Sequence, residues 1–186
     1  MKKIQLPMTE KIAFSLEMLV QNPTNHISIY NEETAMIMDI ARHNGGQILY
    51  ATTSIEQKIE SILLQYFMGP FNEGNEKRTL FEQGLLRSSA FNFKAKKELL
   101  LHVLQQGKSL SKKKINHLQG DLKSIMDWRN TFAHGTLQYH HTHGCTIEYY
   151  SGGTKTLSLD NNYWEKVEAV FQQCDSLMEE ARRNIS

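Results

Sequence analysis

The sequence is poor in the residues that mark secreted, membrane-spanning and disulfide-rich proteins. Its two cysteines, Cys145 and Cys174, are too few for a disulfide framework and lack the spacing of a metal site. It contains no apolar run of about 18 residues, so it predicts no membrane-spanning helix. The apolar stretch near the start is interrupted by Pro7, Thr9 and Glu10, which argues against a signal peptide. These absences predict a cytoplasmic protein.

The overall charge is small, but the lysines are unevenly placed. The formal net charge of +1 excludes a globally basic nucleic-acid binder. Between Asn92 and Lys114, however, lysine stands at positions 94, 96, 97, 108, 112, 113 and 114, with Glu98 as the one acid. Such a patch can attract a polyanion, or it can be the solvated faces of two helices.

Apolar periodicity predicts a helical protein. A front segment, residues 1–45, is expected to hold two short helices separated by a turn at Asn22–Pro23, with a break at Asn44-Gly45-Gly46. The main body, residues 46–186, is expected to begin with a helix that ends at Gly69-Pro70. The predicted helices cover residues 8–20, 31–43, 47–68, 94–106, 110–135 and 162–183, with a weakly helical stretch over 78–91.

A short β-structure interrupts the helices after Gly135. Alternating residues over 145–150 and 155–159, joined by Gly152-Gly153, predict a β-hairpin, and residues 137–141 are a candidate third strand. The predicted fold class is therefore all-α, a helical bundle with a small β-hairpin inserted before the last helix.

Residues 110–135 form the clearest helix, with a serine available as its N-cap and Gly135 as its stop. One face carries apolar residues at three- and four-residue steps and is expected to be buried: Ile115, Leu118, Leu122 and Ile125. The next position of this stripe is Arg129, followed by Phe132. A buried guanidinium is costly unless it meets a carboxylate, a partner chain or an anionic ligand.

Four polar residues gather at the end of this helix. Asp127, Asn130 and His134 share one face, whereas Arg129 and His134 differ in direction by roughly 140°. Arginine suits phosphate oxygens, and histidine can take or give a proton near neutral pH. The alternative is structural: Arg129 pairs with Asp127 or another acid, and His134 sits at the helix C-terminus, where a cation is favoured.

The nonapeptide Asp-Trp-Arg-Asn-Thr-Phe-Ala-His-Gly, residues 127–135, resembles the signature of the HEPN superfamily. The predicted bundle, over about residues 47–183, is similar to the fold of that family. The resemblance implies a homodimeric, metal-independent endoribonuclease without a cofactor, acting in toxin–antitoxin, phage-defence or RNA-processing systems. It marks Arg129 and His134 as catalytic, with Asn130 as the polar residue after the arginine, so these three are the predicted catalytic residues. Asp127, one helical turn before Asn130, could orient either basic group and is the predicted supporting residue. Family members silenced by adenylylation carry a tyrosine two residues after the histidine, where this chain has Thr136.

The expected partners are RNA, a second copy of the chain and an antitoxin or defence partner. The lysine-rich helices are expected to guide RNA through Lys94, Lys97, Lys112, Lys113 and Lys114. Two other interpretations stay open: a non-catalytic HEPN-like module that binds RNA or protein, and a helical dimer in which the polar cluster is an interface ion-pair network.

The remaining candidates are weaker. His140, His141 and His143 could bind zinc or nickel, but no cysteine or carboxylate completes a set, so a solvated loop is favoured and no metal site is predicted. The tyrosines of the hairpin are expected to pack against residues of the neighbouring strand rather than to stack on bases. The methionines, Met8, Met18, Met36 and Met38 among them, are expected to fill the core.

Overall fold

The computed structural model describes residues 1–7, 32–70, 75–140 and 142–185. The predicted helix over 8–20, the turn at Asn22–Pro23 and the methionines Met8 and Met18 lie outside these ranges. The chain divides into two compact units. Unit 1 comprises residues 1–54 and 124–172, and unit 2 comprises residues 55–123 and 173–186.

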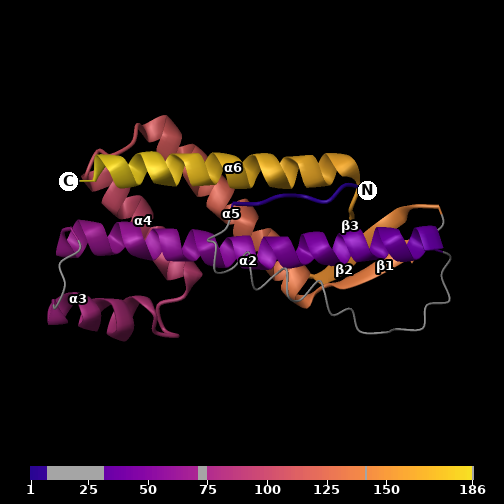
Figure 1. The fold of residues 1–186 in the computed structure, drawn as a ribbon, viewed down its shortest axis with the longest axis horizontal. Coiled ribbons are helices and arrows are strands. Elements are labelled where there is room, and N and C mark those ends of the chain that lie inside the picture. The colour runs from indigo at the N-terminus through magenta and orange to yellow at the C-terminus, as the bar shows by residue number, and fades with distance from the viewer. Residues whose placement is uncertain (8–31, 71–74, 141, 186) are drawn as a thin grey trace. The chain divides into compact units, whose positions relative to one another are not determined.

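The described fold is mostly helical, with one small antiparallel sheet (Figure 1). This confirms the predicted predominance of helix, and the strands stand before the last helix as expected. The elements, in chain order, are α2 (Glu32–Met68), α3 (Glu76–Leu80), the π-helix η1 (Phe81–Leu86), α4 (Phe93–Gln106), α5 (Lys112–His134), β1 (Thr136–His140), β2 (Gly144–Tyr150), β3 (Thr154–Ser158) and α6 (Asn161–Asn184).

The predicted helix break at Asn44-Gly45-Gly46 is wrong, because α2 runs through it without interruption. Asn44 is buried, and its side chain pairs with the backbone of the N-terminal segment: Nδ2 donates to Lys2 O at 2.9 Å and Oδ1 accepts from Ile4 N at 3.0 Å. A Cβ on Gly45 would lie 2.7 Å from Cδ1 of Phe132 in α5. These residues therefore serve tertiary packing. The domain boundary predicted at residue 45 was based on a helix break there, and that break does not exist.

The N-terminal segment of unit 1 is fixed on both sides. Ile4 and Leu6 are buried, while Asn44 holds the backbone from α2. From α6, Glu168 accepts a hydrogen bond from Gln5 N at 3.0 Å and pairs with Lys2 Nζ at 2.6 Å. The first residues thus form part of the fold of unit 1.

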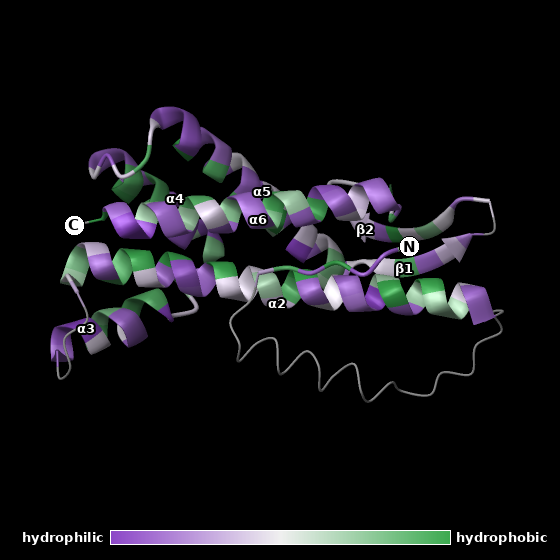
Figure 2. Ribbon diagram, turned by 45° about the horizontal axis from the view of Figure 1, so that its top comes forward, coloured by the Kyte–Doolittle hydropathy of each residue, from purple (hydrophilic) through white to green (hydrophobic). Residues whose placement is uncertain are grey.

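The apolar stripes of the long helices are buried as predicted, and bands of hydrophobic and hydrophilic residues alternate along α2 and α6 (Figure 2). Met36, with 66% of its surface exposed, is an exception to the expectation that the methionines fill the core. No described helix is both long and apolar enough to cross a membrane. Fully buried apolar residues of these helices are Ile48, Ala51, Ile55, Ile59 and Leu63 in α2, Leu118, Leu122 and Ile125 in α5, and Trp164, Val167 and Phe171 in α6.

The sheet has the order β1-β2-β3, so the candidate third strand exists. Thr136 pairs with Glu148, and Thr146 pairs with Ser158. The turn between β2 and β3 contains Gly152 and Gly153, both with positive φ, as the hairpin prediction required. The sheet directly continues α5, because Gly135 alone separates His134 from β1.

Candidate functional site

The four predicted site residues lie on the exposed face of the last two turns of α5, in unit 1. Asp127, Arg129, Asn130 and His134 are all exposed. The structure therefore corrects the expectation that Arg129 occupies the buried stripe. The guanidinium faces solvent, so no desolvation cost forces it to find a partner.

Trp128 takes the buried position that the sequence analysis gave to Arg129. After Ile125 a helical stripe can continue at the third residue, Trp128, or at the fourth, Arg129. The apolar indole of Trp128 is the side chain that is buried. The ring of Trp128 stacks on Phe171 of α6 with centroids 6.4 Å apart, and it meets Tyr163 edge-on at 6.3 Å. Burial raises the pKa of Tyr163, so the phenol behind the cluster stays neutral at physiological pH.

Arg129 is linked to the amide beside it. Its Nη1 donates to Asn130 Oδ1 at 3.1 Å. Asn130 and His134 are four residues apart and differ in direction by about 40°, so this bond turns the guanidinium toward the face that carries the histidine. Among the described residues, Arg129 forms no ion pair with Asp127 or any other acid. Its charge is therefore not neutralised by a described carboxylate.

His134 is the last residue of α5, and the next residue fixes how the chain leaves the helix. Gly135 N donates to Thr131 O at 2.7 Å. A Cβ on Gly135 would lie 2.5 Å from Thr131 O and 2.7 Å from Cγ1 of Ile147, a buried residue of β2. Glycine is therefore required by close packing, and this packing holds the end of α5 against the sheet. An exposed histidine at a helix C-terminus is also where a positive charge is stabilised.

A second close contact supports the same turn from inside. The ring of Phe132 lies against Gly45 of α2 and, on α6, against Trp164 at a centroid distance of 5.8 Å. This role of Gly45 was not predicted, because Gly45-Gly46 was expected to break the helix. A glycine inside a strongly helical pattern, facing a bulky aromatic, is the signal that could have revealed this contact.

Comparison with protein-family models, curated proteins and solved structures gives no match. The resemblance to the HEPN signature consequently remains a proposal, based on residues 127–135.

The lysines of unit 2 divide into engaged and free groups. Lys96 is buried between two glutamates, and Lys97 is buried with Nζ 3.0 Å from Glu98. Lys114 pairs with Glu180 at 2.6 Å. Of the lysines expected to guide RNA, Lys97 and Lys114 thus already have acidic partners. Lys94, Lys112 and Lys113 are exposed and form no ion pair with any described residue.

The histidine tract lies at the turn between β1 and β2. His140 Nε2 is 3.2 Å from Gln138 Oε1, and the rings of His140 and His143 are 6.5 Å apart. His141 lies outside the described residues. Within the described ranges, no three His, Cys, Asp or Glu side chains come together in a way that could hold a metal ion.

Proposed function

We propose that the protein is a metal-independent endoribonuclease of the HEPN type, with Arg129, Asn130 and His134 at its active site. The observation that carries the proposal is the exposed guanidinium of Arg129, oriented by Asn130 toward the face of His134 and paired with no described acid. An exposed cation with a neutral partner keeps its charge for an anionic ligand.

The three side chains suit cleavage of an RNA phosphodiester. The Arg129 guanidinium holds two phosphate oxygens and stabilises the charge that grows on them in the transition state. The 2′-hydroxyl oxygen attacks phosphorus, and the bond from phosphorus to the 5′-oxygen breaks. His134 of one copy takes the 2′-hydroxyl proton, and His134 of the second copy in the proposed dimer protonates the leaving 5′-oxygen. The products are a 2′,3′-cyclic phosphate and a 5′-hydroxyl end.

A homodimer with a composite site belongs to the same proposal. The exposed face of α5 can pack on its copy across a two-fold axis, which brings Arg129 and His134 of both chains to one cleft. The cellular setting that the resemblance implies is a toxin–antitoxin, defence or RNA-processing system, with an antitoxin or defence protein as a further partner.

Substitution of the two charged residues tests this function. Cleavage of RNA by the purified protein in the presence of a chelator should fall by about a hundredfold or more in His134→Ala and in Arg129→Ala. His117→Ala is the matched control, because His117 is exposed on the same helix but lies outside the cluster. Unchanged cleavage in both cluster variants would contradict the assignment. RNA binding that weakens with salt, without any cleavage by the wild type, would favour the non-catalytic module.

A further inference from the structure

A surface cavity of about 410 Å³ lies at the turn between α4 and α5, within unit 2. Its volume falls in the range of small-molecule sites, about 300 to 1,000 Å³. Two of the lining residues, Leu110 and Ile115, are apolar and buried, and the other lining side chains are cationic or carboxamide groups. The lining residues are Gln105, Lys108, Leu110, Lys112, Ile115 and Asn116.

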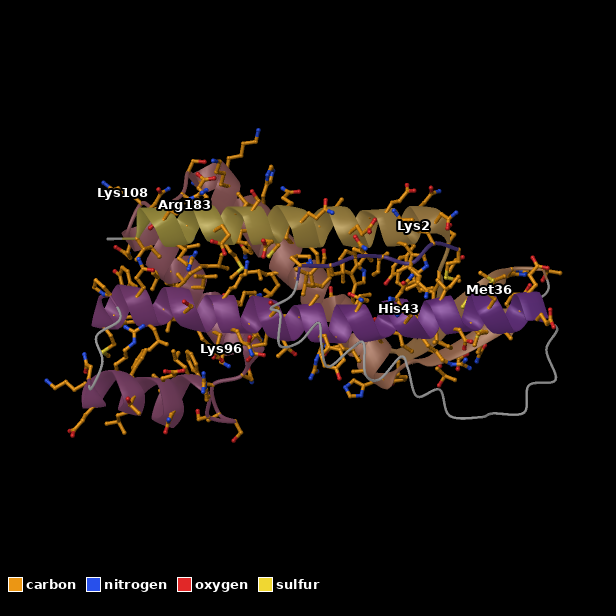
Figure 3. All side chains as sticks on the ribbon, viewed as in Figure 1. Lys2, Met36, His43, Lys96, Lys108 and Arg183 are labelled. Atoms are coloured by element: carbon orange, nitrogen blue, oxygen red, sulfur yellow. The ribbon has the colours of Figure 1, made fainter. Side chains whose placement is uncertain are left out.

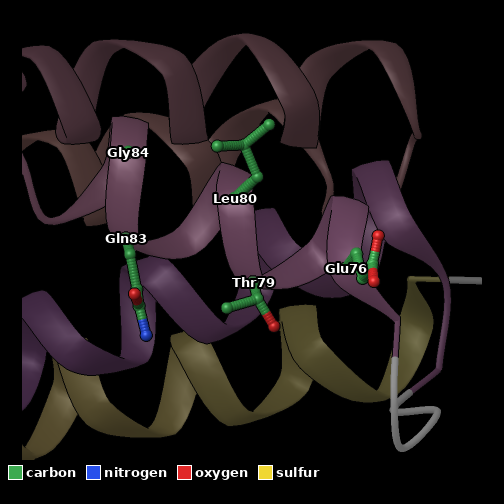
Figure 4. Close-up of a pocket in the computed structure, with 5 residues that line it drawn as sticks. All are labelled: Glu76, Thr79, Leu80, Gln83 and Gly84. Atoms are coloured by element: carbon green, nitrogen blue, oxygen red, sulfur yellow. The ribbon is translucent and has the colours of Figure 1, made fainter.

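A second cavity, of about 560 Å³, lies beside α3 and η1 (Figure 4). Glu76 is the one charged residue that lines it, and Leu80 points away from Thr79 and Gln83. Its lining offers no cation and no converging polar groups, so the chemistry of the first cavity is the more specific.

The cations of the first cavity are unengaged. Residues 99–120 contain four lysines and no acid. Lys114 pairs with Glu180, but Lys108 and Lys112 have no acidic partner among the described residues. Two free ammonium groups over one cavity repel each other, and an anion between them removes that repulsion.

The start of α5 adds to the same positive field. Lysines occupy its first three positions and its first turn contains no acid. This arrangement opposes the preference of a helix N-terminus for negative charge. Ser111 Oγ accepts a weak hydrogen bond from Lys114 N at 3.4 Å, which leaves other first-turn N–H groups without a helical partner. An anion at this point would therefore interact favourably with the lysines and with the helix end.

The C-terminal end of α6 is hydrogen-bonded to this turn. Asn184 Nδ2 donates to Ser109 O at 3.0 Å, and Figure 3 shows Arg183 and Lys108 at the same end of unit 2. Ser109, between two lining residues, is buried and its Oγ has no hydrogen-bond partner among the described residues. The turn thus presents two cationic side chains to the cavity, Lys108 and Lys112, and Ser109 beside it has an unsatisfied buried hydroxyl.

We propose that the cavity at the α4–α5 turn binds a phosphate group carried by an organic molecule. Lys108 and Lys112 neutralise the phosphate charge, and the carboxamides of Gln105 and Asn116 donate hydrogen bonds to its oxygens. The apolar wall of Leu110 and Ile115 contacts the sugar or base of a nucleotide. The phosphate can belong to a free nucleotide or to an RNA chain. The site shares no residue with the Arg129–His134 cluster, so either assignment can fail without the other.

Binding is measured on the full chain with two probes: adenosine 5′-diphosphate and a 2′-O-methyl oligonucleotide of about 12 residues, which has no free 2′-hydroxyl to cleave. Lys108→Gly combined with Lys112→Ala removes both cavity charges. Because Lys108 has φ +50°, glycine relieves a left-handed backbone and the fold should be kept. The control, Lys77→Ala combined with Lys123→Ala, removes two exposed lysines of unit 2 that neither line the cavity nor belong to the lysines expected to guide RNA.

We expect the dissociation constant of at least one probe to rise by about tenfold or more in the cavity variant, and by less than about threefold in the control. Response of the diphosphate alone assigns a free nucleotide, and response of the oligonucleotide alone assigns an RNA backbone. Equal weakening in both variants would mean diffuse attraction and would overturn the site. Failure of the wild type to bind either probe would overturn it as well.

Discussion

Lys96 in unit 2 and Arg129 in unit 1 are both helix cations, but their surroundings differ in every respect. The Lys96 side chain is only 6% exposed, and its Nζ lies 2.5 Å from Glu56 Oε1 and 2.6 Å from Glu60 Oε1. Arg129 is exposed, and its hydrogen-bond partner is the neutral amide of Asn130. Burial obliges a charge to be paired within the chain, whereas exposure leaves it free to meet a ligand. Lys96 thus holds the fold, whereas Arg129 is left free for a ligand.

Lys96→Ala should give the largest effect of the predicted changes. It removes the ammonium between Glu56 and Glu60 and leaves only Arg87, 3.8 Å from Glu60, near the two carboxylates, so we expect the free energy of unfolding to fall by about 3 to 5 kcal/mol. Arg129→Ala should change the same quantity by less than about 0.5 kcal/mol, because it removes an exposed side chain. Urea denaturation at neutral pH measures both. A large loss of stability in Arg129→Ala would mean that this cation also holds the fold.

The same contrast shows what the sequence could and could not reveal. The helices and strands of the described main body follow from periodicity and turn residues, because those signals are local. Burial of one particular side chain is not local. Ile125 can be followed inward by Trp128 or Arg129, and the choice depends on Phe171 and Tyr163, which are distant in the sequence.

In the lysine-rich segment, too, the surroundings of each side chain could not be predicted from the sequence. Seven lysines over 92–114 look equivalent in the sequence, yet Lys96 is buried against glutamates some forty residues earlier in the chain. Lys114 pairs with Glu180, and Lys108 and Lys112 line a cavity. The sequence predicts the net charge of this segment, but which lysines are paired and which are free depends on tertiary contacts.

Gly135→Ala tests how firmly the end of α5 is held beneath its exposed face. The added methyl group would lie against Thr131 O and Ile147, so we expect a loss of about 1 to 3 kcal/mol in the free energy of unfolding. Because the substitution forces the chain after His134 to move, RNA cleavage should fall as well. Gly120→Ala is the matched control on the same helix: apart from its chain neighbours and the helix backbone around it, no described atom lies within 4 Å of its added Cβ. This variant should gain up to about 1 kcal/mol in the free energy of unfolding. Equal effects of the two substitutions would exclude close packing as the reason for Gly135.

Glu168 in unit 1 is expected to make a smaller, pH-dependent contribution to the free energy of unfolding. Burial alone would raise the pKa of Glu168, but the hydrogen bonds from Lys2 and from Gln5 N, together with the Lys2 charge, lower it below its ordinary value of 4.5. A carboxylate with a lower pKa in the folded state stabilises the fold above its unfolded pKa, and this contribution is lost as pH falls through the folded pKa. Glu168→Gln should therefore cost at most about 1 kcal/mol at pH 7, because Lys2 is partly solvated.

This difference between the wild type and Glu168→Gln should disappear in acid well below pH 4.5, where the wild-type carboxylate is also protonated. Asp127→Asn, which changes an exposed carboxylate of the proposed active face, should alter the free energy of unfolding by less than about 0.5 kcal/mol at either pH. Thermal unfolding across this pH range measures both variants. A pH-dependent loss in Asp127→Asn equal to that in Glu168→Gln would show that the exposed face of α5 also contributes charges to stability, and the division between charges that hold the fold and charges left free for a ligand would fail in unit 1.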